Sequence, residues 1–154
     1  MRKSIERGLI IVLAGMALGT VGNLVSPKGI PFFTPPKQIP KADEFLSLDK
    51  AKNFWESGSS VFLDAREPED YKAGHIGNAL NLPAMAFERH FGEVAPMLSP
   101  ESKIVVYCDG TECELSHRLA SQLKQTGYTN VHMLFNGMTA WREAGLPTAQ
   151  GGTP

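Results

Sequence analysis

The chain has 154 residues, of which 42% are hydrophobic and 20% charged, and this composition argues against a disordered chain. Its formal net charge of −1 argues against a nucleic-acid-binding protein. Residues 1–40 hold five basic side chains and one acidic side chain, whereas residues 41–154 hold ten basic and fifteen acidic ones. The charges therefore divide the chain into two pieces of different character. The two cysteines, Cys108 and Cys113, are too few for a disulfide framework.

A membrane-directed segment is predicted at residues 1–25. Three basic residues lie among the first seven, and an uncharged stretch of twenty residues follows from Gly8 to Pro27. A helix of that length spans about 30 Å, which is the thickness of a bilayer core. We predict one uncleaved transmembrane helix in the inner (cell) membrane, with the remaining chain on the periplasmic, extracytoplasmic side. A cleaved signal peptide with a site near Ala17-Leu18-Gly19 stays open as the alternative.

The rest of the chain is predicted to contain a linker, one domain and a short tail. Residues 26–40 include five prolines, which exclude a helix or a central strand and favour an extended spacer. Residues 41–148 form the expected globular domain, and residues 149–154 form a flexible tail. Within the domain the predicted elements, in chain order, are a helix between Ser47 and Gly58, a strand at 61–63 closed by Asp64, a short helix at 67–73, a short strand at 81–82, a strand at 104–107, a helix from about 114 to Gly127, a strand at 131–134 and a helix through 138–144.

Strands that alternate with helices predict an α/β domain. We expect one central, mostly parallel sheet with helices on both faces, preceded by the N-terminal transmembrane helix. Ligands of such sheets bind beyond the carboxyl ends of the strands. Cys108 occupies that place, because it follows the apolar strand 104–107 and precedes a loop and a helix. Loop N–H groups and the helix dipole stabilise a thiolate there, although a buried structural cysteine stays open as the alternative.

Three segments resemble rhodanese-like domains. V-F-L-D-A-R-E-P-E-D-Y-K-A-G-H-I-G-N-A-L-N-L-P at 61–83 resembles the first signature of that family. I-V-V-Y-C-D-G-T-E-C-E-L-S at 104–116 resembles its strand and active-site loop. Q-T-G-Y-T-N-V-H-M-L-F-N-G-M-T-A-W-R-E-A-G-L-P at 125–147 resembles its C-terminal signature. The segments lie in the family's order and spacing, and the resemblance covers essentially residues 41–148.

The resemblance implies a single rhodanese-like domain that acts as a sulfurtransferase. Cys108 takes the position of the nucleophile that carries sulfane sulfur as a persulfide, and no metal or organic cofactor is implied. A small donor such as thiosulfate or polysulfide supplies the sulfur, and a thiol, a cyanide-like nucleophile or a protein accepts it. The substrate-binding loop is expected to comprise Asp109, Gly110, Thr111, Glu112 and Cys113, and the supporting residues are expected to be Asp64, Arg66 and His75.

The loop departs from the family pattern C-x-x-G-x-R. Gly110 lies at the second position after Cys108, and the loop carries acids rather than a cation. Carboxylates near an anion site oppose doubly charged donors and raise the pKa of a thiol, so we expect inefficient turnover of thiosulfate. The absence of arginine from the loop also argues against a phosphatase of the same fold. Arg66 is expected to pair with the nearby acids Glu67, Glu69 and Asp70, and contact with an anionic substrate is its alternative.

Cys113 opens a second functional hypothesis. Its thiol could attack a persulfide or sulfenate on Cys108 and form an intramolecular disulfide, provided that the two Cα atoms lie within about 7 Å of each other. The alternative function is therefore a thiol-redox or non-catalytic binding module of the same family that uses Cys108 and Cys113. The arrangement of Cys108, Cys113 and His117 lacks a fourth ligand, so no metal site is predicted.

Overall fold

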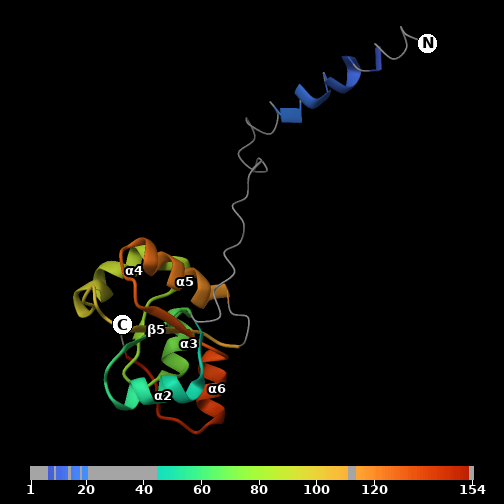
Figure 1. Ribbon diagram of the computed structural model, residues 1–154. Helices are drawn as coiled ribbons and strands as arrows, with labels where there is room; N and C mark the ends of the chain where they lie inside the picture. The colour runs from blue at the N-terminus through green and yellow to red at the C-terminus, as the bar shows by residue number, and fades with distance from the viewer. Residues whose placement is uncertain are drawn as a thin grey trace. The chain divides into compact units, whose positions relative to one another are not determined.

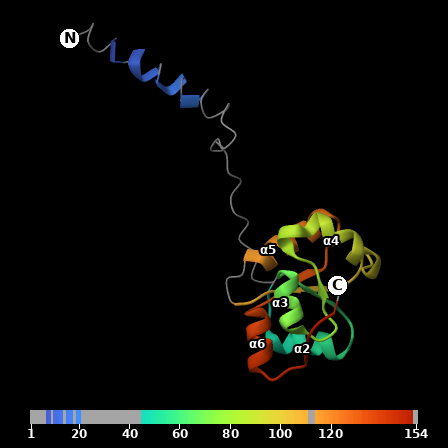
Figure 2. The ribbon, with the colours of Figure 1, turned by 180° about the vertical axis from the view of Figure 1, so that it is seen from behind.

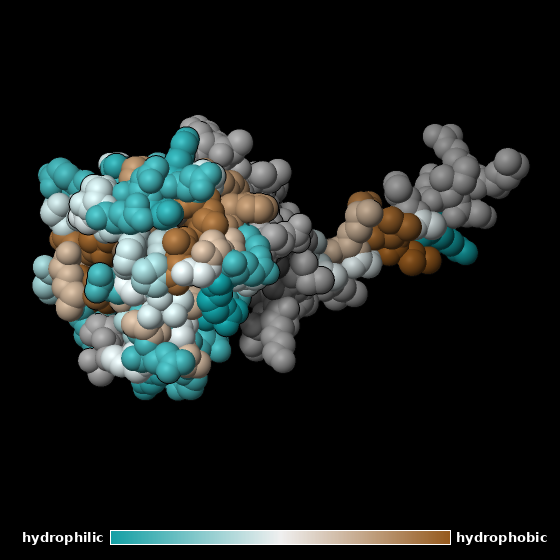
Figure 3. Space-filling model, turned by 90° about the horizontal axis from the view of Figure 1, so that it is seen from below, coloured by the Kyte–Doolittle hydropathy of each residue, from teal (hydrophilic) through white to brown (hydrophobic). Residues whose placement is uncertain are grey.

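The computed structural model describes residues 7–8, 10–13, 15–17, 19–20, 45–110 and 114–152. The chain forms two compact units, residues 1–39 and residues 40–154, and each is described by itself. In the first unit the described residues are helical, and the side chains from Ile10 to Leu13 are more than half exposed. This part appears largely brown, and therefore hydrophobic, in Figure 3. Among the residues described there, no helix is long and apolar enough to cross a membrane, so the predicted transmembrane helix is not supported.

The second unit is built on a five-stranded sheet whose strands are all parallel (Figure 1). Its spatial order is β1-β6-β5-β2-β4. The strand bounds in that order are Phe45–Leu46, Val131–Leu134, Ile104–Tyr107, Val61–Asp64 and Leu80–Asn81. In the register of β2 with β5, Asp64 lies beside Tyr107 at the carboxyl ends of both strands. The predicted parallel sheet is confirmed, and β5 lies at its centre.

Helices cover both faces of the sheet, as predicted; Figure 1 shows the two layers on opposite sides of β5, and Figure 2 shows the same helices from behind. On one face, α2 (Leu48–Glu56) and α6 (Gly137–Glu143) pack against Val105 and Tyr107 through a core that includes Trp141. On the other face, α4 (Phe87–Val94) and α5 (Glu114–Gln125) pack against Ile104 and Val106 through Leu119 and Leu123. Successive side chains of β5 point to opposite faces, and all four are fully buried.

The structure contains several short elements that the sequence patterns did not predict. The single turns η2 (Ala84–Ala86) and η3 (Ala95–Met97) flank α4, and β1 adds two residues to the edge of the sheet. Helix α4 was missed although Phe87, Phe91 and Val94 recur at helical spacing, because Gly92 interrupts the segment and the helix has only eight residues. The strand expected at 81–82 lies at Leu80–Asn81, and α3 (Pro68–Ala73) begins one residue later than expected.

The C-terminal segment differs from the predicted flexible tail. Thr148–Ala149 forms β7, which pairs antiparallel with β3 (His75–Ile76). The N–H of Gly151 then donates a hydrogen bond to the carbonyl of Lys72 over 2.9 Å. These residues have little apolar side chain to indicate order, and their order comes from backbone pairing with a distant segment. Chain position and composition alone could not reveal that partner.

Candidate active site

Cys108 lies directly beyond the carboxyl end of the central strand β5. The residue is only 2% exposed and belongs to the core that α4 and α5 cover. The adjacent strand β2 turns at the same edge, where the N–H of Ala65 donates to the carbonyl of Tyr107 over 2.9 Å. The edge of the parallel sheet therefore brings the cysteine beside the turn that follows Asp64, as expected for a ligand site of this sheet type.

The backbone of Cys108 is held by the first residues of α6. The N–H of Met138 donates to the carbonyl of Cys108 over 2.8 Å, and Asp109 forms an isolated antiparallel bridge with Gly137. A Cβ atom placed on Gly137 would lie 1.8 Å from that carbonyl oxygen, and the φ angle of Gly137 is +36°. Only glycine fits here without displacing the backbone of Cys108. The turn after β6 therefore fixes where the cysteine segment begins.

The sulfur of Cys108 lies close to the first turn of α5. Its Sγ is 3.4 Å from the hydroxyl oxygen of Ser116, which is 6% exposed, and 3.8 Å from the carbonyl oxygen of Asp109. A hydroxyl at that distance can donate a hydrogen bond to a sulfur anion, and the dipole of a twelve-residue helix favours negative charge near its amino end. Cys108 is disulfide-bonded in this structure. The only other cysteine of the sequence is Cys113, which lies outside the described residues.

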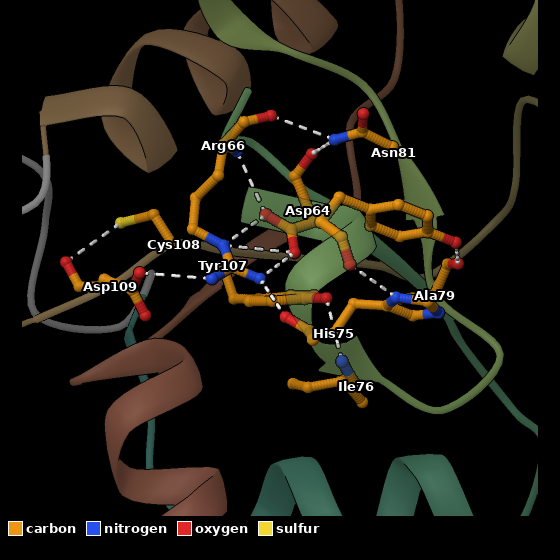
Figure 4. Close-up of polar contacts among 11 residues, drawn as sticks. Asp64, Arg66, His75, Ile76, Ala79, Asn81, Tyr107, Cys108 and Asp109 are labelled. Carbon is orange, nitrogen blue, oxygen red and sulfur yellow. Dashed lines mark hydrogen bonds and ion pairs between the residues drawn. The ribbon is translucent and has the colours of Figure 1, made fainter. Parts of the chain in front are cut away.

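Arg66 connects the turn after β2 to the cysteine segment (Figure 4). Its Nε donates to Asp64 Oδ1 over 2.9 Å and its Nη2 to Asp64 Oδ2 over 2.6 Å, while its Nη1 donates to Asp109 Oδ2 over 3.1 Å. Nη2 also donates to the carbonyl of Gly74 over 2.7 Å. We call Asp64, Arg66 and Asp109 the charge trio. In the described part of the chain, the ion partners of Arg66 are these two aspartates and not the predicted Glu67, Glu69 and Asp70.

The charge trio keeps Arg66 protonated although the residue is only 6% exposed. Burial works against the charge of the guanidinium, but the hydrogen bonds and charge of Asp64, followed by those of Asp109, raise the pKa of Arg66 above its ordinary value. The Asp64 side chain is fully buried, whereas the Asp109 side chain is 50% exposed. Two carboxylates thus share one guanidinium, and the exposed partner is the one next to Cys108.

Several buried polar groups hold the turn around the charge trio. Asn81 donates to the carbonyls of Asp64 and Arg66 over 3.1 and 2.9 Å. The hydroxyl of Tyr107 accepts a hydrogen bond from the N–H of Ile76 over 3.1 Å. Burial, and then the neighbouring Asp64 carboxylate, raise the pKa of Tyr107 far above its ordinary value.

His75 is buried and contacts Tyr71 of α3. Its ring stacks on Tyr71 with centroids 3.7 Å apart, and Nδ1 lies 2.8 Å from the carbonyl oxygen of Tyr71. The Tyr71 hydroxyl donates to the carbonyl of Ala79 over 2.7 Å, and burial, then Asp64, raise the pKa of Tyr71. The described contacts of the His75 side chain are therefore with α3, and none of them is with Cys108.

The structure brings most of the described candidate residues together. Asp64, Arg66, Cys108 and Asp109 form one contiguous site at the carboxyl edge of the sheet. Gly110 has a φ angle of +81°, a left-handed conformation that favours glycine. Thr111, Glu112 and Cys113 lie outside the described residues, so the predicted backbone cradle there stays a prediction. Within the part of the chain that the structure describes, no three His, Cys, Asp or Glu side chains lie close enough together to hold a metal ion.

Sequence reasoning did not assign Gly137, Ser116 or Tyr107 to the site. A sequence signal for this turn exists, because Asn136-Gly137 is a turn dipeptide that lies one residue after β6. In the structure both residues have positive φ angles. Nothing in the local sequence indicates, however, that this turn contacts a residue 29 positions earlier in the chain. That contact depends on β5 and β6 being neighbours in the sheet.

Comparison with known proteins identifies a family match over most of the folded unit. Residues 47–144 match the family described as the rhodanese-like domain. The chain is 34% identical over 96 residues to the HTH-type transcriptional regulator Rv0324 of Mycobacterium tuberculosis, and the aligned region covers 62% of this chain and 40% of that relative. It is 29% identical over 114 residues to the tRNA uridine(34) hydroxylase of Photorhabdus laumondii, and the aligned region covers 70% of this chain and 32% of that relative. The chain thus spans less than half the length of these curated relatives.

Solved structures show the same fold. The rhodanese-like domain of Alr3790 from Anabaena sp. has a TM-score of 0.59 at 26% identity, with 70% of this chain and 79% of that chain covered. A thiosulfate sulfurtransferase from Pseudomonas aeruginosa has a TM-score of 0.57 at 25% identity, with 71% of this chain but only 20% of that chain covered. The similar proteins thus carry names from different functional classes, and the shared part in each is one domain.

Proposed function

The chain belongs to the rhodanese-like domain family, and on that premise we propose that it is a sulfurtransferase that carries a sulfane sulfur as a persulfide on Cys108. The observation that carries this proposal is the position of the Cys108 sulfur. It lies beyond the carboxyl end of the central parallel strand and 3.4 Å from the Ser116 hydroxyl, in the first turn of α5. One side of the sulfur therefore has a hydrogen-bond donor and the positive end of a helix dipole, which both favour an anionic sulfur.

The proposed reaction consists of two nucleophilic substitutions at sulfur. In the first, the Cys108 thiolate attacks the outer sulfur of thiosulfate, a new S–S bond forms, and sulfite leaves with the bonding electron pair. The products are a persulfide anion on Cys108 and sulfite, so charge and atoms balance. In the second step cyanide or a thiolate attacks the outer sulfur, and the Cys108 thiolate leaves. The loop N–H groups and Ser116 would bind the sulfur that bears negative charge in each step.

Measurement of intact mass tests this proposal with the full chain. The protein is first reduced and freed of reductant, because Cys108 is disulfide-bonded in the structure. It is then incubated with thiosulfate or with polysulfide. A persulfide adds one sulfur atom, about 32 Da, and treatment with cyanide removes it as thiocyanate. Wild type is compared with Cys108→Ser and Cys113→Ser, because the first variant removes the proposed sulfur carrier and the second keeps it.

The three proteins distinguish the outcomes. The proposal expects the added sulfur in wild type and Cys113→Ser, and none in Cys108→Ser. Sulfur on Cys108→Ser would place the carrier at Cys113 instead. No added sulfur with either donor, in protein whose thiols alkylate fully after reduction, would contradict a sulfurtransferase and favour a binding module.

The disulfide on Cys108 supports a second candidate function, a thiol-redox reaction between Cys108 and Cys113. In this reaction the Cys113 thiol attacks the inner sulfur of a Cys108 persulfide. The new bond joins the two cysteines, and the outer sulfur leaves as hydrosulfide with the thiol proton, so the sulfur donor serves as the oxidant. The observation behind it is that Cys108 is disulfide-bonded rather than a free thiol.

The same mass measurement separates the two candidates. A redox reaction gives wild type a mass about 2 Da below the reduced protein and releases sulfide, whereas Cys113→Ser keeps the persulfide. Two thiols that stay separately alkylatable after donor treatment would exclude the intramolecular disulfide. A persulfide of equal lifetime in wild type and Cys113→Ser would also exclude it.

A further part of the proposal is a membrane tether at the N-terminus, with the domain on the periplasmic side. It depends on the sequence of residues 1–25, with its basic flank and uncharged stretch. Fractionation of cells that express the full chain, followed by an alkaline carbonate wash, tests it. Retention of the full chain in the membrane, but not of a chain that starts at residue 26, is expected. A reporter that is active only in the cytoplasm can be fused to the C-terminus, and activity of that fusion would contradict the proposed orientation.

A further inference from the structure

The geometry points to Asp109 as a specificity-determining residue that disfavours doubly charged sulfur donors, an inference that rests on the proposed sulfurtransferase function. Arg66 is the only cation whose contacts join the turn after β2 to the cysteine segment among the described residues. Its Nη1 is occupied by Asp109 Oδ2 at 3.1 Å. Asp109 therefore binds the guanidinium edge that faces the cysteine segment and reduces the positive charge that this edge presents to an anion.

The other polar atoms of Arg66 are already committed to fixed partners. Nε and Nη2 bind the fully buried Asp64 carboxylate, and Nη2 also binds the carbonyl of Gly74. The Arg66 side chain is 7% exposed, so it cannot turn to another anion without breaking these contacts. Nη1 is the edge that points toward the cysteine segment, as Figure 4 shows. Whatever occupies Nη1 decides whether the guanidinium contributes positive charge to the site.

The net charge beside Cys108 follows from this pairing. Asp64 already compensates the charge of Arg66, so Asp109 leaves the charge trio with one negative charge in excess. That excess lies on a half-exposed side chain adjacent in sequence to Cys108. An approaching donor therefore meets a negative charge, and the repulsion grows in proportion to the charge of the donor. The structure assigns this site to monoanionic or neutral sulfane donors in preference to dianions.

Two donors that undergo the same chemistry provide the test. Thiosulfate carries two negative charges and releases sulfite, whereas benzenethiosulfonate carries one and releases benzenesulfinate. In both cases the Cys108 thiolate takes the outer sulfur, and cyanide then removes it as thiocyanate. The rate of thiocyanate formation gives kcat/KM for each donor with the reduced full chain. The ratio of the two values isolates the effect of donor charge from effects on the cysteine itself.

The variants are Asp109→Asn and Asp109→Ala, with Glu101→Gln as the matched control. Asparagine removes the charge but keeps an oxygen that can accept from Nη1, and alanine frees Nη1 entirely. Glu101 is exposed and precedes the amino end of β5, so it lies at the opposite end of the strand from Cys108. The control loses one negative charge without touching the charge trio.

Asp109→Asn is expected to raise kcat/KM for thiosulfate about tenfold, equivalent to about 1.4 kcal/mol. The rise for benzenethiosulfonate is about threefold, because a monoanion feels half the electrostatic energy. Asp109→Ala should show at least the same change, and Glu101→Gln should leave both values within about twofold. Wild type itself offers an independent check, since salt screens the repulsion: between about 0.05 and 0.5 M salt its kcat/KM for thiosulfate should rise.

Each contrary result has a distinct meaning. Equal changes of kcat/KM for the two donors would overturn the role of Asp109, and so would a wild-type kcat/KM for thiosulfate that falls as the salt concentration rises. In both cases thiocyanate formation itself would still support the sulfurtransferase. No thiocyanate from either donor in wild type or any variant would overturn the sulfurtransferase and the inference together. Melting temperatures of the variants show whether a lost rate reflects unfolding, and in that case the salt dependence of wild type decides.

Discussion

The turn after β2 and the cysteine segment after β5 are adjacent parts of the candidate site, yet different interactions fix them. Side chains hold the turn, because Asp64, Arg66 and Asn81 bind one another and the local backbone. Backbone contacts hold the cysteine segment, because Met138 binds the carbonyl of Cys108 and Gly137 lies against it. The first arrangement is sensitive to charge and the second to volume. A substitution that harms one part should therefore affect the other mainly through the ion pair of Arg66 with Asp109.

The largest effect is expected from Asp64→Asn, which tests the charge-dependent part. Arg66 would remain buried with only the half-exposed Asp109 as a charged partner. Removal of one partner of a buried ion pair costs about 4 kcal/mol of unfolding free energy. Chemical denaturation checks this value, with the exposed Asp49→Asn as a control that should change stability by less than about 0.5 kcal/mol. A loss below about 1 kcal/mol for Asp64→Asn would mean that Asp109 alone compensates the charge of Arg66.

Gly137→Ala tests the volume-dependent part. The added Cβ lies 1.8 Å from the carbonyl oxygen of Cys108, and the positive φ angle of +36° adds strain, so the backbone must shift. We expect a loss of about 3 kcal/mol and a slower formation of the Cys108 persulfide. The matched control is Gly92→Ala in α4, where a Cβ meets no atom within 4 Å; it should be neutral or stabilise slightly. Equal stability of the two variants would contradict the proposed contact.

Tyr107→Phe tests a smaller contribution to stability. Tyr107 is the last residue of β5, next to the cysteine segment, and its hydroxyl accepts a hydrogen bond from the N–H of Ile76. Loss of that acceptor leaves a buried N–H unpaired and costs about 1.5 kcal/mol. The variant also changes the pH dependence. The raised pKa keeps Tyr107 protonated in the folded chain, so its stabilisation is complete below about pH 10 and declines as the pH rises further, by at most about 1.4 kcal/mol per unit.

Denaturation at pH values from about 8 to 11 measures this decline, because an unfolded tyrosine loses its proton at about pH 10. Tyr107→Phe should decline less steeply than wild type. Tyr128→Phe, which removes a tyrosine outside the site, serves as the control. An identical slope in Tyr107→Phe and wild type would assign the decline to other groups.

The smallest effect on stability is expected from Asp109→Asn. Its side chain is 50% exposed, so solvent screens its pairing with Arg66, and we expect a loss of about 0.5 kcal/mol. The same substitution is expected to raise kcat/KM for thiosulfate about tenfold. Thermal unfolding measures the stability term. A loss as large as that of Asp64→Asn would show that Asp109 supports the fold and would remove it as a clean probe of specificity.

The local sequence was sufficient to predict the main strands and the position of the cysteine. The apolar run at Ile104–Tyr107 and the turn residues that bound it are local signals, and they placed Cys108 beyond a buried strand. The family resemblance, rather than a local pattern, implied that Asp64 and Arg66 support the turns near the loop. Apolar residues that recur every two residues predict a strand, and those that recur every 3.6 residues predict a helix, so such elements can be recognised within a single segment.

Long-range pairing was decided only in the tertiary structure. The contact of Gly137 with Cys108 exists because β6 lies beside β5. One of the two ion partners of Arg66 is Asp109, 43 residues away, rather than Glu67, Glu69 or Asp70. The strand β7 forms by antiparallel pairing with β3, which lies more than 70 residues earlier in the chain. Hydrogen bonds and ion pairs depend on which segments the sheet order brings together, and the amino-acid pattern of one segment contains no information about the position of another.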